Sequence, residues 1–305
     1  MWHRLGRNIL MTYTTYPSRG RWLSLVINHA DAWGLTCTIT SLGLILHGNF
    51  NLQHFPLLLA VTVSYWLGFA VNDYFDAQYD GADVKKASRN FFCQVHLPKE
   101  LLAASAVLLQ VGVFVVFASY GLRGALTYFM AIFIMWAYSA SPIRLKNRPG
   151  LDLLTHALFV QTFPYFVAVA LPATGWERVD GGLLLMFILA SLAAQLEQQV
   201  RDFHVDSQFE SNFTIWFGLR PTRLLLKVIT TLLGIHVVGM IVLGVLPTFL
   251  LPYILIAMPV MLHRYVRGKR NRSESLVRFS VILSLVYTAI VWIGVLSGYY
   301  VVSAL

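Results

Sequence analysis

Carboxylate and amide side chains recur at helical spacing at the end of an apolar segment, residues 55–76. Asn72, Asp76 and Asp80 follow one another at intervals of four residues, and Asp73 lies three residues before Asp76. Residues three or four apart share a face of an α-helix, so the spacing predicts one polar stripe. Like charges at this spacing repel, and carboxylates near hydrocarbon are costly. The stripe therefore predicts a bound partner that neutralises it.

A second stripe follows another apolar segment, residues 182–202, where Asp202 and Asp206 repeat the same spacing. A single pair of this kind is often only a solvated helix end, but two pairs at one membrane depth favour a shared ligand. Mg²⁺ takes oxygen ligands and bridges carboxylates to substrate phosphates. We predict a Mg²⁺ site in which the four paired aspartates are catalytic. The predicted metal ligands are Asn72, Asp73, Asp76, Asp80, Asp202 and Asp206.

Basic side chains accompany both acidic stripes. They lie in the segment after the first stripe, in the segment near residue 145, and beside Asp202. Lys and Arg bind phosphate oxygens through charge-assisted hydrogen bonds. Acid pairs, a divalent metal and basic loops together predict a diphosphate ligand. The predicted diphosphate-binding residues are Asn72, Lys85, Lys86, Arg89, Arg144, Lys146 and Arg201.

The composition requires that a membrane bundle position these groups. The 305 residues are 57% hydrophobic and 12% charged, with a mean hydropathy of +0.64. These values exclude a soluble or a disordered chain. A helix needs about 20 apolar residues to cross a bilayer, and no apolar segment alternates with period two. We predict an all-α bundle of nine transmembrane helices, near residues 23–48, 55–76, 100–119, 122–141, 151–172, 182–202, 222–246, 248–266 and 277–304.

The basic residues predict the orientation of this bundle. Of 23 Lys and Arg, all but Arg123 and Arg178 fall on one side of the predicted spans. By the positive-inside rule that side is cytoplasmic, which places the N-terminus and the acidic stripes at the cytoplasmic face. The net charge of +9 then reflects topology and attraction to anionic headgroups, so no nucleic-acid partner is expected. The chain, residues 1–305, is expected to form a single domain.

The acidic motifs resemble those of a known family. Residues 72–80, Asn-Asp-Tyr-Phe-Asp-Ala-Gln-Tyr-Asp, resemble the N-D-x-x-D-x-x-x-D motif of the UbiA superfamily of intramembrane prenyltransferases, and residues 201–206 resemble its second motif. Residues 138–146 also resemble the tyrosine-then-basic segment of that superfamily. The resemblance implies nine helices with these motifs on the second and sixth. It also implies Mg²⁺-dependent transfer of a prenyl group from a prenyl diphosphate to a lipophilic acceptor within the membrane.

The acceptor is expected to be aromatic or isoprenoid, and residues 144–152 are somewhat similar to the carotenoid-elongating branch. Polar groups inside the spans are its predicted contacts, because an ionisable residue in a span suggests function. Asp31 is predicted to pair with His29 or His156 and to act as a catalytic base; a helix–helix hydrogen bond is an equal alternative. Glu197 lies four residues before Arg201, which predicts a local ion pair. The predicted substrate-pocket residues are Asn28, His29, Tyr74, Tyr138, His156 and Glu197.

Two other functions remain open. A prenyl-diphosphate cyclase would use the same metal motifs and quench the allylic cation internally. A secondary transporter would also bury polar residues in helices, but transporters favour helices broken near the midplane. Here the carboxylates gather at helix ends, which favours an enzyme.

Overall fold

The computed structural model of the chain describes residues 25–81, 84–95, 98–172, 175–208, 210–268, 270 and 272–298. No side chain is described for Lys85 or Lys99. The described residues form helices and connecting turns, and they contain no β-strand. The predicted all-α fold is therefore confirmed over this part of the chain.

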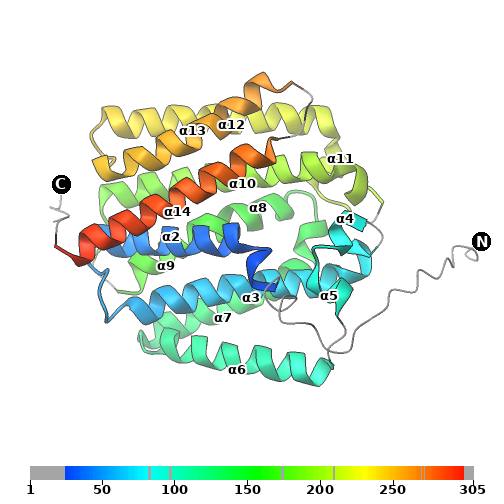
Figure 1. Cartoon of the computed structure of the whole chain (residues 1–305), viewed down its shortest axis with the longest axis horizontal. Helices are drawn as coiled ribbons and strands as arrows, with labels where there is room; N and C mark the ends of the chain where they lie inside the picture. Colours follow the sequence, from blue (N-terminus) through cyan, green and yellow to red (C-terminus); the bar gives the residue numbers. More distant parts are fainter. Residues whose placement is uncertain are drawn as a thin grey trace, which may run out of the picture.

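Long helices lie side by side along one direction, and short helices gather at one end of the bundle (Figure 1). The short α-helices are α4 (Val84–Ala87), α5 (Phe91–Gln94) and α11 (Phe213–Phe217). Two 3₁₀ turns, η1 (Leu145–Asn147) and η3 (Thr248–Leu250), and one π-helical turn, η2 (Leu158–Thr162), interrupt the pattern. The remaining helices are α2 (Ala30–Leu46), α3 (Phe55–Asp80), α6 (Lys99–Ala118), α7 (Gly121–Ser139), α8 (Leu151–Ala157), α9 (Phe163–Ala170), α10 (Arg178–Asp206), α12 (Leu219–Val242), α13 (Leu251–Val266) and α14 (Glu274–Leu296).

Eight segments of the described chain are long and apolar enough to cross a membrane, with α8, η2 and α9 together forming one of them. The first predicted span corresponds to α2, an apolar helix of 17 residues. That length is at the lower limit for crossing hydrocarbon. The count of nine spans and the cytoplasmic N-terminus remain predictions, and residues 1–24 lie outside the described part.

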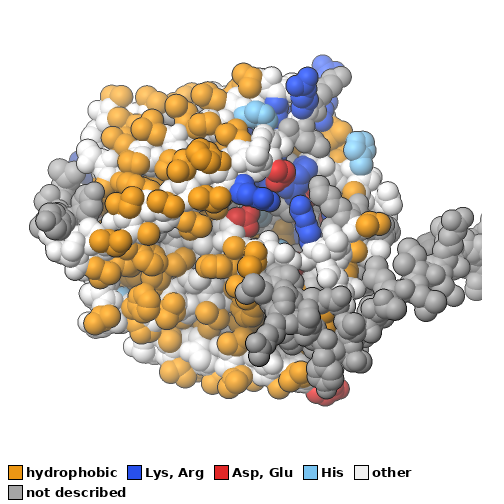
Figure 2. Space-filling model, in the orientation of Figure 1, with side chains coloured by type: hydrophobic (Ala, Val, Ile, Leu, Met, Phe, Trp, Pro, Cys, Tyr) orange, Lys and Arg blue, Asp and Glu red, His pale blue; other side chains and the backbone are white. Residues whose placement is uncertain are grey.

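Apolar side chains cover most of the face shown in Figure 2, and its charged side chains gather toward one end. Among the exposed apolar side chains of the long helices, Leu108, Ile235 and Ile293 are each more than 60% exposed. A helix that is apolar all round and exposed is suited to contact with lipid. By contrast, α10 and the α8–α9 segment each bury more than 40% of their most apolar window. They form the centre of the bundle.

A buried polar cluster joins helices at the end opposite the acidic motifs. Asp180 lies in the first turn of α10 and is fully buried, and its carboxylate accepts a hydrogen bond of 2.6 Å from the Tyr165 hydroxyl of α9. His47, at the end of α2, lies 3.0 Å from the same carboxylate oxygen. The other Asp180 oxygen accepts from the Glu177 backbone N–H at 2.6 Å. A buried carboxylate is tolerated when it is paired in this way, so the cluster fixes the relative positions of α2, α9 and α10.

Close packing of α2 against α9 generates a prediction. A Cβ added to Gly43 would lie 2.7 Å from Ala168 Cβ and 3.4 Å from the Tyr165 carbonyl oxygen. Overpacking of this kind typically costs about 1–3 kcal/mol, so Gly43→Ala is expected to lower the melting temperature of the detergent-solubilised protein. Gly112→Ala is the control, because nothing lies within 4 Å of a Cβ at Gly112 of α6. Equal melting temperatures for the two variants would contradict this packing.

Candidate active site

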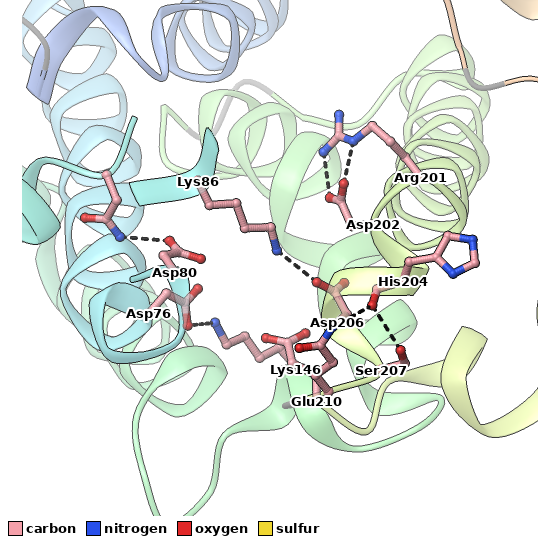
Figure 3. Close-up of polar contacts among 12 residues, drawn as sticks. Asp76, Asp80, Lys86, Lys146, Arg201, Asp202, His204, Asp206, Ser207 and Glu210 are labelled. Atoms are coloured by element: carbon pink, nitrogen blue, oxygen red, sulfur yellow. Dashed lines mark hydrogen bonds and ion pairs between the residues drawn. The ribbon is translucent and has the colours of Figure 1, made fainter. Parts of the chain in front are cut away.

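The two acidic stripes reach the same cavity from opposite walls. Asp76 and Asp80 lie in the last turns of α3, and Asp202 and Asp206 lie in the last turns of α10. All four line one cavity of about 300 Å³, and Figure 3 shows the two groups facing each other across it. Both helices end here, where the short helices of Figure 1 gather. The predicted stripes are thus brought together by tertiary structure.

The cavity is polar at this end and apolar along its length. Its lining follows α3 from Asp80 back to Val61, which is about 28 Å at 1.5 Å per residue. The apolar walls include Phe117 of α6, Tyr128 and Ile132 of α7, and Phe163 of α9. A π-helical turn, η2, supplies Phe159 and Val160 to the same wall; such turns are often found at functional sites. This shape is suited to a ligand with an anionic head and a long hydrocarbon tail.

Asp76 is held by a cluster of hydrogen-bond donors. Lys146 Nζ contacts Asp76 Oδ1 and lies 3.2 Å from Asn72 Oδ1. Arg144 Nη2 approaches the same Asp76 oxygen at 3.5 Å. Asn72 donates to Asp76 Oδ2 at 3.0 Å and accepts from Ser139 Oγ at 2.8 Å. The Asn72 amide is thereby oriented, with its oxygen toward cations and its nitrogen toward a carboxylate.

The backbone conformation between α7 and α8 directs Arg144 and Lys146 toward Asp76. Arg144 has a φ of +38°, a left-handed conformation that is uncommon for a residue other than glycine. The next turn, η1, then directs Lys146 into the cavity. The Arg144 guanidinium lies 4.2 Å from the centre of the Tyr79 ring, a cation–π contact. Conformational strain at this position is thus compensated by contacts to α3.

Lys86 bridges the cavity from the segment after α3 (Figure 3). Its Nζ donates to Asp206 Oδ1 at 2.9 Å. Burial by itself lowers the pKa of Lys86, but the carboxylates of Asp206, Asp202 and Asp80 outweigh that effect and raise it above its ordinary value. Lys86 therefore remains a cation at neutral pH. It joins a loop that follows the first motif to the aspartates of the second.

Asn90 and Glu210 are among the residues at this end that were not predicted from the sequence. Asn90 donates to Asp80 Oδ2 at 2.9 Å and to the Asp73 carbonyl oxygen at 2.8 Å. Glu210 lines the cavity and lies 3.6 Å from Arg144 Nη2. Glu210 follows Asp206 by four residues, so the spacing of the second motif was a signal for it. No sequence periodicity pointed to Asn90, which caps the N-terminus of the short helix α5.

The electrostatic environment of Glu210 differs from that of an exposed glutamate. Burial raises its pKa to about 7, and the nearby carboxylates of Asp206 and Asp76 add to this effect, while Lys146 and Arg144 oppose it. Glu210 therefore carries less than a full negative charge at neutral pH. The cavity mouth is accordingly less acidic than a count of its carboxyl groups suggests.

Asp202 differs from the other three aspartates in its partner. Arg201 donates to both of its oxygens, each at 2.8 Å. The Arg201 side chain is outside the cavity lining and also lies 3.6 Å from Glu274 of α14. A bidentate guanidinium pair is geometrically specific. Arg201 thus orients Asp202 from behind and does not face the cavity.

A buried network holds the segment that carries Glu210. Asp152 of α8 is fully buried, and its Oδ2 accepts from the Gln199 side chain at 2.5 Å and from the Phe213 N–H at 2.8 Å. Gln199 Oε1 in turn accepts from the Thr214 hydroxyl at 2.9 Å. These bonds tie α8, α10 and α11 together directly beneath the polar end of the cavity.

Of the predicted substrate-pocket residues, two line the cavity. Tyr138 lies near its polar end and His156 lies on the α8 wall. His156 Nδ1 is buried without a hydrogen-bond partner among the described residues. Tyr74 is exposed and packs edge-on against Phe75 and Phe92; it does not line the cavity.

The remaining predicted residues near the first motif lie outside the cavity lining. Asp73 is buried and pairs with His29 Nε2 at 2.9 Å, so His29 has Asp73 as its carboxylate partner and the predicted Asp31–His29 hydrogen bond does not form. Asp31 is exposed. Asn28 donates to the carbonyl oxygen of Arg89, another exposed residue. The side chain of Lys85 lies outside the described part.

The predicted ion pair between Glu197 and Arg201 does not form. Glu197 accepts from Arg264 Nε at 2.8 Å and also contacts Arg267 Nη1. Arg264 lies in the last turn of α13, and Arg267 directly follows that helix. Arg201 instead forms its ion pair with Asp202. The side chain of Glu197 points between α10, α12 and α13, away from the acidic cavity. The buried guanidinium groups of Arg264 and Arg267 neutralise it more completely than the partly exposed Arg201 could.

The donor set of the cavity fits a hard divalent cation. Its acidic groups are carboxylates, and Mg²⁺ prefers oxygen ligands while retaining water and substrate phosphate oxygens. Within the described chain, no three His, Cys, Asp or Glu side chains converge on one point. The arrangement therefore fits a metal that is shared between a few carboxylates and a bound phosphate group, and it does not fit an all-protein cage.

Comparison with known proteins identifies the class. The chain matches the UbiA prenyltransferase family over residues 34–286, and it belongs to that family. No curated protein sequence matches the chain at a significant level. Together with the eight segments of the described residues that are long and apolar enough to cross a membrane, the family membership makes this chain an integral multi-pass membrane protein.

Solved structures share the fold at low sequence identity. A UbiA homolog from Archaeoglobus fulgidus bound to GPP and Mg²⁺ is 16% identical, covers 91% of this chain and 99% of its own, and has a TM-score of 0.69. The same homolog bound to DMAPP and Mg²⁺ is 16% identical, covers 88% and 98%, and has a TM-score of 0.68. A further structure of a UbiA homolog from Archaeoglobus fulgidus is 17% identical, covers 91% of this chain and 99% of its own, and has a TM-score of 0.56.

The buried network beneath the cavity generates a prediction. Asp152→Ala leaves the Gln199 amide and the Phe213 N–H without their acceptor, which typically costs about 1–3 kcal/mol for each buried group. We expect a lower melting temperature in detergent and faster proteolysis between α10 and α11. Glu100→Ala, an exposed acid at the start of α6, is the control. An Asp152 variant as stable as this control would show that the network does not hold the segment.

Proposed function

We propose that this protein transfers a prenyl group from a prenyl diphosphate to a lipophilic acceptor, in a Mg²⁺-dependent reaction within the membrane. The observation that carries the proposal is a cavity lined at one end by four aspartates and two lysines, with Arg144 beside Asp76, and with a long apolar wall behind them. A prenyl diphosphate has the same division between a multiply charged head and a hydrocarbon tail. Membership of the UbiA prenyltransferase family and the fold shared with a homolog bound to GPP and Mg²⁺ support it.

The aspartates are the proposed metal ligands. Asp76 and Asp80 of α3 and Asp202 and Asp206 of α10 would hold Mg²⁺, which when bound supplies Lewis-acid stabilisation of the departing diphosphate. Asn72 orients Asp76, and Asn90 orients Asp80. Hydrogen bonds of this kind fix ligand geometry before binding.

The cations beside these carboxylates are the proposed diphosphate ligands. Lys86 and Lys146 extend into the cavity from loops on either side, and Arg144 lies between Asp76 and Glu210. They are within reach of any anion held by the aspartates. Fixed positive charge at the leaving group stabilises the negative charge that develops as the C–O bond breaks. Arg201 would act through Asp202, as a positioning residue.

The apolar wall of the cavity would exclude water from the reacting carbon atom. As the diphosphate leaves, an allylic cation forms, and water must be kept from it. Phe69 and Tyr138 line the cavity beside Asn72 and Ser139 of its polar end, where aromatic rings can face a cation. His156 and Gln195 are polar groups on the opposite wall and are the proposed contacts of the acceptor. We further propose that the site faces the cytoplasm, since the loops that carry these cations are basic.

Loss of the aspartates tests the metal assignment. Asp76→Ala and Asp202→Ala are each expected to lower turnover below detection in membranes supplied with Mg²⁺ and a prenyl diphosphate. The reason is that each removes a ligand from one wall of the cavity. Glu100→Ala is expected to turn over normally. Melting temperatures within a few degrees of the native protein would show that the aspartate variants remain folded; activity retained in both would contradict the assignment.

The same assay separates transfer from cyclisation. Radiolabelled prenyl diphosphate is incubated with membranes in the presence and absence of aromatic and isoprenoid acceptors, and the lipid-soluble product is identified. A product that requires the acceptor and contains both partners supports transfer. A cyclic product formed without any acceptor would show that the protein is a cyclase.

The length of the apolar wall generates a prediction about the substrate tail. Ala131 of α7 lines the cavity beyond its polar end, so Ala131→Trp would obstruct the tail without contacting the aspartates. We expect the KM for a long prenyl diphosphate to rise about tenfold more than the KM for a short one. Met130→Trp, on the exposed face of α7, is the matched control. An equal change for long and short substrates would place the tail elsewhere.

A further inference from the structure

A second pocket of about 330 Å³ lies between α10, α12 and α13. It shares no lining residue with the acidic cavity. Eight of its lining residues are Lys or Arg, and Glu197 is its one acidic residue. The proposed prenyl transfer does not use it.

Three of the basic residues come from the first turns of α12. Arg220, Arg223 and Lys227 follow one another at intervals of three and four residues, so they share one helix face. None of them forms an ion pair with any residue that the structure describes. Three like charges on one face repel, and this arrangement is stable only with counterions or a bound anion.

Two more arginines form the buried floor of the pocket. Arg264 and Arg267 of the α13 end are each less than 10% exposed, and both contact Glu197, which is 4% exposed. Arg264 Nη1 also donates to Thr230 Oγ1 at 3.2 Å. Two guanidinium groups against one carboxylate leave a net positive charge in a buried place. A buried charge without full compensation is costly, so the floor favours an anion above it.

The remaining basic residues are distributed around the rim. Arg201 pairs with Asp202 and Glu274, and Arg272 pairs with Glu274. Arg270 has no ion pair among the described residues. Eight cations thus face three carboxylates in all, which leaves an excess of five positive charges around one pocket. In the lining of the acidic cavity, by contrast, five carboxyl groups outnumber two lysines.

We propose that this pocket binds a phosphate-bearing anion. Guanidinium groups match phosphate oxygens in bidentate geometry, and the pocket offers them from two helices and a connecting segment. Its position, at the ends of apolar helices α12 and α13, is where the headgroups of a membrane leaflet lie. The same chemistry is present in the headgroup of an anionic phospholipid and in free pyrophosphate. Glu197 holds the two floor arginines in place and is not itself a ligand.

The test measures binding to the purified full-length protein without Mg²⁺ and in the presence of EDTA. These conditions remove metal-dependent binding in the acidic cavity, so the result is independent of the proposed prenyl transfer. In one arm, delipidated protein is titrated with phosphatidylglycerol or phosphatidylcholine in detergent, and bound lipid is counted by native mass spectrometry. In the other arm, radiolabelled pyrophosphate is titrated by equilibrium dialysis.

The variants compare the pocket with an ordinary surface. Arg223→Gln combined with Lys227→Gln removes two unpaired charges from the α12 face. Arg278→Gln, an exposed residue of α14 outside the pocket, is the matched control. We expect the double variant to bind at least about tenfold more weakly than native protein, which corresponds to the loss of one charge-assisted hydrogen bond. Arg278→Gln is expected to bind as native protein does.

Each outcome of these binding measurements either supports or overturns the proposed anion site. Saturable binding of phosphatidylglycerol but not phosphatidylcholine, weakened in the double variant alone, supports the proposal and identifies a lipid headgroup as the source. Saturable pyrophosphate binding with the same dependence supports it and identifies the free anion. Binding that is equally strong in the double variant and the control, or no saturable binding of either anion, overturns it. Arg223→Lys combined with Lys227→Arg retains both charges and is expected to restore binding, which distinguishes lost charge from lost folding.

Discussion

Neutralisation of paired aspartates at the end of an apolar bundle is the constraint on which the rest of this structure depends. Asp76 and Asp206 lie on opposite walls, and each has a lysine from a separate loop, Lys146 and Lys86. Carboxylates so close to hydrocarbon are tolerable only when they are paired or bound to a metal. The loops between the spans are therefore drawn over the cavity by the charges at the helix ends. Helix ends and loops together form a site with the electrostatic character that a metal-bound diphosphate requires.

The interior of the bundle keeps this arrangement in register. The Asp152 network ties α8, α10 and α11 beneath the polar end, and the Asp180 cluster ties α2, α9 and α10 at the far end. Both use a fully buried carboxylate that accepts hydrogen bonds from neighbouring elements. Between these two points α10 is the common member, and it carries the second acidic motif. Because buried polar networks specify one arrangement of helices, they fix the position of α10, which forms one wall of the cavity, against α2, α8 and α9.

The two polar pockets differ in their charge balance, and this difference indicates different ligands. In the acidic cavity each aspartate has a nearby hydrogen-bond donor. A metal ion bound to a diphosphate would replace these contacts, because the metal would bind the carboxylates and the diphosphate would bind the cations. In the basic pocket the Glu197–Arg264–Arg267 triad and the α12 face leave positive charge without compensation. A phosphate anion alone would satisfy it. Membership of the UbiA prenyltransferase family accounts for the first pocket, whereas the second follows from how α13 packs against α10 and α12.

The sequence by itself determined the apolar spans and the two acidic stripes, because both depend on periodicity along one helix, and the four aspartates of these stripes do line one cavity. It also pointed to Lys86, Arg144 and Lys146, since basic residues beside acidic motifs are visible locally. Only the tertiary structure decided which charges meet. Glu197 pairs with α13 and not with Arg201, Asp73 pairs with His29, and Asn90 reaches Asp80. Such pairings depend on which helices and turns become neighbours, and helix packing is set by side chains far apart in the chain, which no local spacing records.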